Sequence, residues 1–434
     1  MREGWGEAVN GMRGMVVGRA WERSFHWLWA SYAVSSFGTW FAFDAFPLIA
    51  ILVLHVGPAA VSALAAAGLA VGALVAAPLG PWIEFRRKRP VMMAMDLIRF
   101  AALMSIPVAF ALGWLSYAQL LIAAVITSAA GIVFKAASGG FLKTLIPLED
   151  LLAANGRFES TTWTATALGP PLGGAAVGLF GPVITVVADA VSYLLSAAGL
   201  CAIGGAEPQP AGRQVPQFRA GDLFEGWRCI LAHPVLRPLF FNTVWVNGLI
   251  LATSPLVAVL MLGRLGFAPW QYGLAFGAPG VGGLMGARLS RGLVARFGER
   301  RILLAFGTLR ACWPLGLAFI PPGIAGIVLV LTVQLGLVTC IGVFNPVFAT
   351  CRLNATGADR VARTLSAWSI TSSATIATLT ALWGVLASLT SPRIAIATAG
   401  VLMLGTPFLL PWRRGVPAVE AQQERARSVR ADGA

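Results

Sequence analysis

Two aspartates that lie within long apolar stretches could bind and release protons. Asp44 lies well inside the first stretch, and Asp189 lies about 10 Å into a later one at 1.5 Å per residue. A carboxyl group at membrane depth is costly and normally faces a cavity or a partner, so a proton-coupling role is indicated. The structural alternative for Asp44 is an acid hydrogen-bonded to a neighbouring helix. For Asp189, proton uptake and a contact between helices are equally supported.

Two arginines occupy similar places in two other apolar stretches, about 14 Å from one end at helical rise. Arg99 could pair with Asp96 or with a carboxylate on another helix, because an arginine at membrane depth rarely stays unpaired. For Arg310 we favour a side chain that extends toward the cytoplasmic surface.

Aromatic and amide side chains in these stretches could bind an amphipathic ligand by stacking and hydrogen bonding. The candidates for a central cavity are Trp40, Trp163, Asn242, Trp245, Asn247, Asn345 and Trp368. Many tryptophans are more simply interfacial anchors or packing residues. The histidines are far apart, the cysteines lack metal-ligand spacing, and no phosphate-binding loop of the type GxxxxGK[ST] is present. We therefore predict no metal, no cofactor and no enzymatic activity.

The elements that carry these residues are predicted from composition. The chain of 434 residues is 57% apolar and 12% charged, with a mean hydropathy of +0.76, whereas soluble domains carry roughly 25% charged residues. Apolar runs long enough to span a bilayer recur throughout, and a helix satisfies its own backbone inside hydrocarbon. An all-α polytopic membrane protein is indicated.

Twelve membrane-spanning helices are predicted from these runs. Their approximate bounds are 27–54, 61–83, 90–113, 115–138, 159–180, 182–204, 239–262, 272–294, 302–321, 323–349, 364–388 and 393–412. A polar linker at 205–238 separates an N-terminal six-helix bundle, 27–204, from a C-terminal one, 239–412. Short segments, 1–26 and 413–434, flank them.

The two halves resemble copies of one another. The string Pro47–Leu54 recurs as Pro255–Leu262, 208 residues later, and this offset sets Ala252 opposite Asp44. Phe134 matches Phe344 at an offset of 210 and Trp163 matches Trp368 at 205. Repeats of the same orientation are typical of transporters that rock about a substrate site between their halves.

The net charge of +14 is distributed in a way that argues against nucleic acid as a partner. Lysines and arginines gather in alternate joints between the apolar runs, as the positive-inside rule describes. We therefore expect the linker and both termini to be cytoplasmic, in a bacterial-type inner membrane. The first 26 residues mix arginines with glutamates, so no signal peptide is predicted.

The joint after the second span resembles the loop signature of the major facilitator superfamily, a glycine, an acid four residues later and then arginine and lysine. The residues that carry this resemblance are Gly80, Glu84, Arg86, Lys88 and Arg89, with Glu84 in place of the usual aspartate. In that family these charges bridge helix ends in the outward-open state and separate when the interior opens. A role in topology alone is the alternative.

Further segments resemble the drug and siderophore exporter branch, which includes enterobactin-exporter-like and macrolide-efflux-like proteins. One is Asp96-Leu97-Ile98-Arg99, and another is a stretch in the fifth span that resembles the antiporter motif. That stretch comprises Gly169, Pro170, Pro171, Leu172, Gly173 and Gly174. Its glycines and prolines suit a helix that bends and approaches its neighbours closely, although packing alone would also explain them.

The resemblance implies a monomeric major facilitator fold that exports a small amphipathic molecule, such as a drug, siderophore or secondary metabolite, in exchange for protons. Protonation of Asp44 or Asp189 would favour the inward-open state. An importer of a nutrient or lipid shares every feature apart from the family branch. A passive facilitator or channel would need no titratable switch, and Asp44 argues against it.

Overall fold

The computed structural model describes residues 23–84, 86–145, 151–203, 220–356 and 361–412. Within these ranges the secondary structure is helical and contains no strand. Nine helical stretches of the described residues are long and apolar enough to cross a membrane. The predicted all-α polytopic fold is therefore confirmed.

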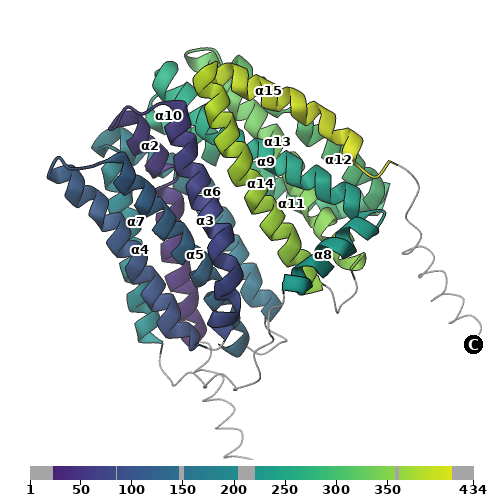
Figure 1. Ribbon diagram of the computed structural model, residues 1–434, viewed down its shortest axis with the longest axis horizontal. Helices are drawn as coiled ribbons and strands as arrows, with labels where there is room; N and C mark the ends of the chain where they lie inside the picture. The colour runs from purple at the N-terminus through teal and green to yellow at the C-terminus, as the bar shows by residue number, and fades with distance from the viewer. Residues whose placement is uncertain (1–22, 85, 146–150, 204–219, 357–360, 413–434) are drawn as a thin grey trace, which may run out of the picture.

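The N-terminal half begins with a helix at residues 23–41, which is interrupted at 42–44. The helices that follow are α2 (Ala45–Leu52), α3 (Pro58–Glu84), α4 (Lys88–Ala111), α5 (Tyr117–Leu145), α6 (Leu151–Phe180) and α7 (Pro182–Ala202). Together they form the purple-to-teal bundle in Figure 1.

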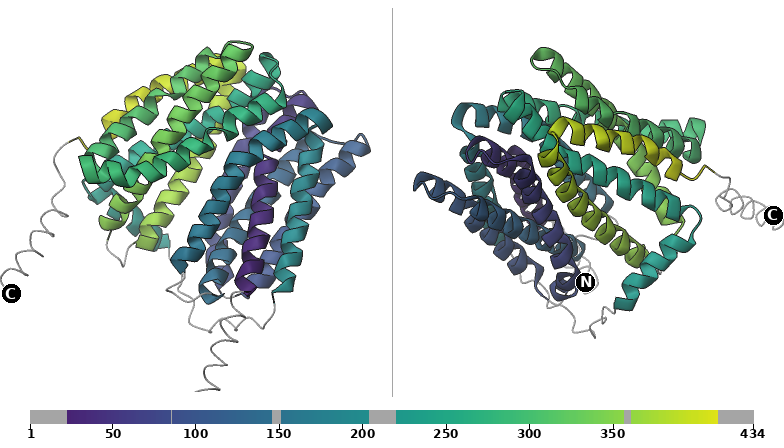
Figure 2. Two further views of the ribbon diagram at one scale, coloured as in Figure 1. Left: turned by 180° about the vertical axis from the view of Figure 1, so that it is seen from behind. Right: turned by 45° about the horizontal axis from the view of Figure 1, so that its top comes forward.

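The C-terminal half is built in the same way, with more interruptions. Its elements are α9 (Leu236–Ala258), η1 (Val259–Arg264), α10 (Pro269–Gly277), α11 (Gly280–Phe297), α12 (Glu299–Cys312), η2 (Pro314–Phe319), α13 (Ile324–Asn354), α14 (Val361–Leu389), α15 (Pro392–Gly405) and η3 (Thr406–Leu409). The two bundles lie side by side in every view (Figure 2).

Each of the twelve predicted spans coincides with a helix or with consecutive helical segments, so two pseudo-symmetric six-helix bundles are present. Hydropathy did not reveal the interruptions. The first span breaks where Asp44 takes a left-handed conformation, with φ of 55°, and others break beside Pro279 and Pro314. Inside the predicted linker, α8 (Ala220–Ala232) is helical, and the Trp227 indole N–H donates to Thr371 Oγ1 on α14 at 2.9 Å.

The molecule has two different ends. The basic end carries α8, near the bottom of Figure 1, and its exposed or half-buried cations include Arg86, Arg87, Lys88, Arg89, Arg228, Arg237, Arg296, Arg300, Arg301 and Arg352. The opposite end carries α2 and α10, at the top of Figure 1, with the turns at 53–57, 112–116 and 265–268.

Apolar packing joins the two halves at the end of the molecule that carries α2 and α10. One hydrophobic cluster contains Leu48, Ile49 and Leu64 of the N-terminal half together with Leu256 and Leu260 of the C-terminal half. At the basic end each half has its own cluster. One is built around Phe25, Met92 and Phe141, and the other around Ile230, Phe240 and Phe344. Among the described residues, the halves therefore share a core at one end only.

Glycines bring the two halves into backbone contact at this shared core. A Cβ atom at Gly273 of α10 would overlap the carbonyl oxygen of Pro170 in α6, and one at Gly174 would come within 2.6 Å of the carbonyl oxygen of Pro269. On the other side of the interface, a Cβ at Gly384 of α14 would overlap the side chain of Ser62 in α3. Small residues allow this close packing, which stabilises helix pairs in a membrane.

Two glycines of α6 allow a test of such close packing inside the N-terminal half, next to the interface. Replacing Gly173 with alanine would drive its Cβ into the carbonyl oxygen of Phe41, whereas the Cβ of Gly178→Ala meets only Trp270 Cδ1 at 3.9 Å. We expect Gly173→Ala to destabilise the protein by about 1–3 kcal/mol through overpacking, and Gly178→Ala to be neutral or stabilising. Thermal unfolding in detergent measures both, and equal melting temperatures would contradict this account.

Candidate functional site

Asp44 connects the two halves of the molecule. It lies at the break of the first span, where its left-handed backbone ends one helix and α2 begins. The phenol of Tyr272, in α10 of the other half, donates to Asp44 Oδ2 at 2.5 Å. Tyr272 is 1% exposed and Asp44 is half-buried. The aspartate at membrane depth thus has a partner, and that partner belongs to the other bundle.

Aromatic rings surround this hydrogen bond. Phe43 stacks against both Trp40 and Tyr272, with centroids 5.9 and 6.5 Å apart, and Phe276 lies 4.8 Å from the Tyr272 ring. Such rings exclude water and lower the local dielectric, so the hydrogen bond is electrostatically stronger than it would be in water.

A second group of charges lies entirely within the N-terminal half. Arg99 Nη1 is 3.6 Å from Asp96 Oδ1 on the preceding turn of α4. The guanidinium also lies over the rings of Phe134 and Tyr193, 4.8 Å from each centroid, and Nη2 donates to the Ala130 carbonyl at 3.2 Å. Asp96 and Arg99 are therefore brought together, as the sequence indicated for this pair.

Asp189 of α7 belongs to the same group and is 7% exposed. Its Oδ1 accepts long hydrogen bonds of 3.4 Å from the hydroxyls of Thr39 and Ser192, and Thr39 Oγ1 lies 2.8 Å from the Tyr193 hydroxyl. Both carboxylate oxygens of Asp96 lack a hydrogen-bond partner, as does Ser196 Oγ. Asp96 is therefore the acid that pairs with Arg99, and Asp189 lies near the same arginine, linked through Thr39 to Tyr193, whose ring contacts the guanidinium.

The C-terminal half buries an arginine without an acid. Arg310 is 1% exposed, its Nη2 donates to Asn242 Oδ1 at 2.6 Å, and its guanidinium lies 3.7 Å from the Phe344 centroid. No carboxylate in the described part of the chain forms an ion pair with it. The expected extension toward the surface is wrong, because this position of α12 faces α9 and α13 inside the bundle.

The repeat explains the likeness of the two arginines. Arg99 with Phe134 and Arg310 with Phe344 form the same cation–π contact in equivalent places of the two halves. The acids are not repeated, since Asp96 corresponds to Gly307 and Asp44 to Ala252. Acidic chemistry inside the described helices is therefore concentrated in the N-terminal half.

Two cavity candidates are packed inside the C-terminal half. Asn242 is fully buried, and its Nδ2 donates to the Thr406 carbonyl at 2.8 Å. Trp368 packs against Phe240 with centroids 4.9 Å apart. The equivalent pair in the first half is Tyr32 and Phe158, 4.6 Å apart, so Trp368 corresponds to Phe158 and not to Trp163.

The remaining cavity candidates fall into two groups. Trp40 and Trp163 are half-buried near the junction of the halves, where a Cβ at Gly283 of α11 would lie 2.9 Å from the Trp163 ring. Trp245, Asn247 and Asn345 are exposed.

The loop after α3 braces the N-terminal half. Arg89 Nε and Nη2 donate to the carbonyls of Leu200 and Cys201 at 2.8 and 2.6 Å, capping the end of α7. Lys88 Nζ donates to the Arg86 carbonyl at 2.9 Å. The side chains of Gly80 and Glu84 lie outside the described set.

The glycine-proline stretch of α6 lies at the junction of the first span, α6 and α10. Gly169 and Gly173 contact the backbone of Trp40 and Phe41, next to the break, and Gly174 faces α10. Pro170 and Pro171 lie inside α6, and Pro171 packs against Gly277. This stretch therefore supports the part of the first span that carries Asp44.

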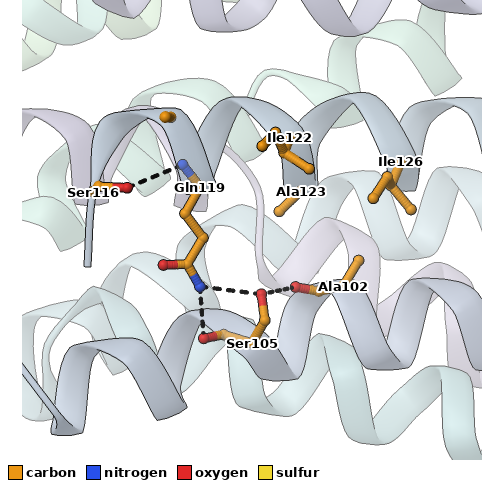
Figure 3. A pocket seen from close by; sticks show the side chains of 8 residues that line it. Ala102, Ser105, Ser116, Gln119, Ile122, Ala123 and Ile126 are labelled. Atoms are coloured by element: carbon orange, nitrogen blue, oxygen red, sulfur yellow. Dashed lines mark hydrogen bonds between the residues drawn. The ribbon is translucent and has the colours of Figure 1, made fainter. Parts of the chain in front are cut away.

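A cavity of about 280 Å³ lies elsewhere, between α4 and α5 (Figure 3). Gln119 Nε2 donates to the Ser105 carbonyl at 2.8 Å on its wall, and the exposed side chain of Ile122 also lines it. Its lining contains none of the charged residues described above.

Sequence reasoning missed Tyr272, Tyr193 and Thr39. A usable signal was the scarcity of tyrosine, with four tyrosines against 24 phenylalanines. In an apolar environment a phenol needs a hydrogen-bond partner, and all four hydroxyls have one. Each tyrosine therefore marked a specific polar contact.

A family model described as the Major Facilitator Superfamily matches residues 28–373. The chain belongs to this superfamily. A relative from Bacillus subtilis (strain 168), the uncharacterized MFS-type transporter YvqJ, is 26% identical over 285 residues, which cover 64% of this chain and 67% of YvqJ. The protein is thus a multi-pass membrane transporter of small molecules and not an enzyme.

Solved transporters share its fold. A POT family transporter in complex with 5-aminolevulinic acid gives a TM-score of 0.68 at 12% identity, over 89% of this chain and 95% of the other. The nucleoside transporter NupG gives 0.66 at 10% identity, over 90% and 97%. A bacterial homologue of the iron transporter ferroportin, in an inward-facing state, gives 0.67 at 18% identity, over 89% and 99%.

The two buried arginines should respond differently to substitution. Arg99→Met leaves the buried Asp96 without its cation, which costs about 3–5 kcal/mol when that charge stays buried. Arg310→Met leaves only the Asn242 oxygen unpaired, at about 1–3 kcal/mol. Thermal unfolding should show the larger loss for Arg99→Met.

A double substitution separates charge from packing in this comparison. Adding Asp96→Asn to Arg99→Met removes one uncompensated acid and should recover part of the lost stability. A double variant less stable than Arg99→Met, or equal losses for the two arginine variants, would contradict the assignment.

Proposed function

We propose that this transporter exports a small amphipathic compound, such as a drug, siderophore or secondary metabolite, in exchange for protons. The observation that carries the proposal is the excess of acids within the N-terminal half. Asp44, Asp96 and Asp189 are buried or half-buried there, and Arg99 is the buried cation among the described side chains of that half. Such an excess gives the protein a place to bind protons during transport.

The location of the shared core supports an inward-facing state. The positive-inside rule assigns the basic end to the cytoplasm, with both termini and the linker at 205–238 on that side of a bacterial-type inner membrane. The apolar cluster that includes Leu48 and Leu256 then closes the outer side, while separate clusters at the basic end leave the halves free to part there. The similarity in fold to a ferroportin homologue solved in an inward-facing state agrees with this conformational state.

Asp44 is the better of the two proton carriers. Its partner lies on the other half, so its surroundings change whenever the halves move apart at the outer side. Asp189 contacts Thr39 within its own half. Its environment therefore stays the same when the two halves move during transport. Because a neutral acid is cheaper to bury than a charged one, a proton taken up from outside favours closure of the outer side.

Export of an amphipathic compound is supported by the sequence resemblance to the drug and siderophore exporter branch. Its motifs are Asp96-Leu97-Ile98-Arg99 and the glycine-proline stretch that begins at Gly169. The two bundles, 27–204 and 239–412, act as the rocking units of a monomer. Closure of the basic end would bring the charged loop with Arg86 and Lys88 against the other half.

Efflux from proteoliposomes under an imposed pH gradient tests the proposal. A panel of macrolides, siderophores and amphipathic dyes is compared for the unsubstituted protein, Asp44→Asn and Asp189→Asn. We expect gradient-driven export of at least one compound, reduced by Asp44→Asn to the level of protein-free liposomes because the amide cannot carry the proton. Asp189→Asn should retain coupled export.

Glu225→Gln, the same acid-to-amide change at the basic end, serves as the matched control and should transport normally. Coupled export that persists in Asp44→Asn and is lost in Asp189→Asn would transfer the role to Asp189. A gradient that drives every transported compound inward, or none at all, would overturn export.

A further inference from the structure

We infer that Tyr272 is the residue through which the C-terminal half responds to the protonation state of Asp44. This inference rests on the proposed proton coupling and adds a positioning residue that sequence comparison does not supply. The Tyr272 hydroxyl donates to Asp44 Oδ2 at 2.5 Å across the contact between the two halves. Opening of the outer side must break this bond, because its two ends belong to different bundles.

The backbone on both sides holds the pair in place. Asp44 has a φ of 55°, in the left-handed region, which aspartate adopts more readily than most residues other than glycine. Tyr272 lies in the first turn of α10, where the Gln271 side chain accepts from the Ala268 N–H at 2.8 Å. The next residue, Gly273, brings α10 against the Pro170 carbonyl. Tyr272 is therefore fixed at one of the closest backbone contacts between the halves.

Other ionisable groups around Asp44 are engaged elsewhere or face outward. On α7, Asp189 and Tyr193 both contact Thr39. His55, after α2, and Arg264, at the end of η1, are exposed. Among the described side chains, Tyr272 is the one that hydrogen-bonds the Asp44 carboxyl.

The bond makes closure depend on the charge of Asp44. When Asp44 is ionised, the phenol donates to a carboxylate, and such charge-assisted bonds are roughly twice as strong as neutral ones. When Asp44 is protonated, the acid is cheap to bury and the same phenol makes a weaker neutral bond. Tyr272 therefore contributes more to outer closure at high pH than at low pH, and it keeps the closed state accessible after the proton leaves.

Distance measurements between spin labels test this inference without any substrate. Labels are placed on the outer turns of the two halves, at Trp114→Cys and Ile324→Cys, which are 76% and 80% exposed. The native cysteines are replaced, and distances are measured by pulsed EPR in lipid at pH 5.5 and pH 8. The variants compared are Tyr272→Phe, Asp44→Asn and, as matched control, Tyr32→Phe.

Tyr272→Phe keeps the ring and removes only the hydroxyl. We expect it to raise the ratio of open to closed outer ends about tenfold at pH 8, the size of a net charge-assisted hydrogen bond, and by clearly less at pH 5.5. Asp44→Asn should stay closed at both pH values, because the amide is neutral and can still accept from Tyr272. Tyr32→Phe should behave as the unsubstituted protein, since the Tyr32 hydroxyl contacts Thr162 within its own half.

Two results would overturn the inference. An unchanged distance distribution in Tyr272→Phe would show that the hydroxyl does not hold the outer side closed. An equal shift at both pH values would reduce Tyr272 to a packing residue that does not respond to Asp44. Failure of proton-driven efflux is a separate outcome, because these distances are read without transported compound and without a gradient.

Discussion

Close packing at one end of the molecule is the constraint on which the rest of this structure depends. Lipid is as apolar as a protein core, so two helix bundles gain little from the hydrophobic effect when they meet inside a bilayer. The bundles are held together by close van der Waals packing. Gly273, Gly174 and Gly384 make this packing possible because they have no side chain to keep the helices apart. Because this packing occurs at the end that carries α2 and α10 and not at the basic end, the motion that the proposed export requires is a pivot about it.

The buried acids differ in how a movement of the two halves would affect their surroundings. One acid, Asp44, lies at the contact between the halves, whereas Asp96, paired with Arg99, and Asp189 lie inside the N-terminal bundle. The same physics makes both arrangements costly in hydrocarbon, but only the first changes its surroundings when the halves part. In the proposed mechanism, the environment of Asp44 therefore changes during transport, whereas that of Asp96 and Asp189 stays the same.

Hydropathy predicted the twelve spans because length and apolarity are local properties of the chain. It did not predict the break at Asp44, since a left-handed residue is held by the contacts around it. The surroundings of Arg310 were also missed, because its partner Asn242 lies 68 residues earlier and meets it only after the helices pack. Trp368 was misaligned for the same reason. Its counterpart, Phe158, is recognised by its ring contact and not by residue type.

The arginine–phenylalanine contact is present in both halves, while the acids beside it occur in one half only among the described residues. Arg99 with Phe134 and Arg310 with Phe344 occupy equivalent positions in two bundles of similar construction. One half carries buried acids near its arginine, and the other is neutral around its arginine. If the N-terminal acids couple transport to protons, as proposed, the C-terminal half can diverge in what it recognises, because substitutions there leave those acids unchanged.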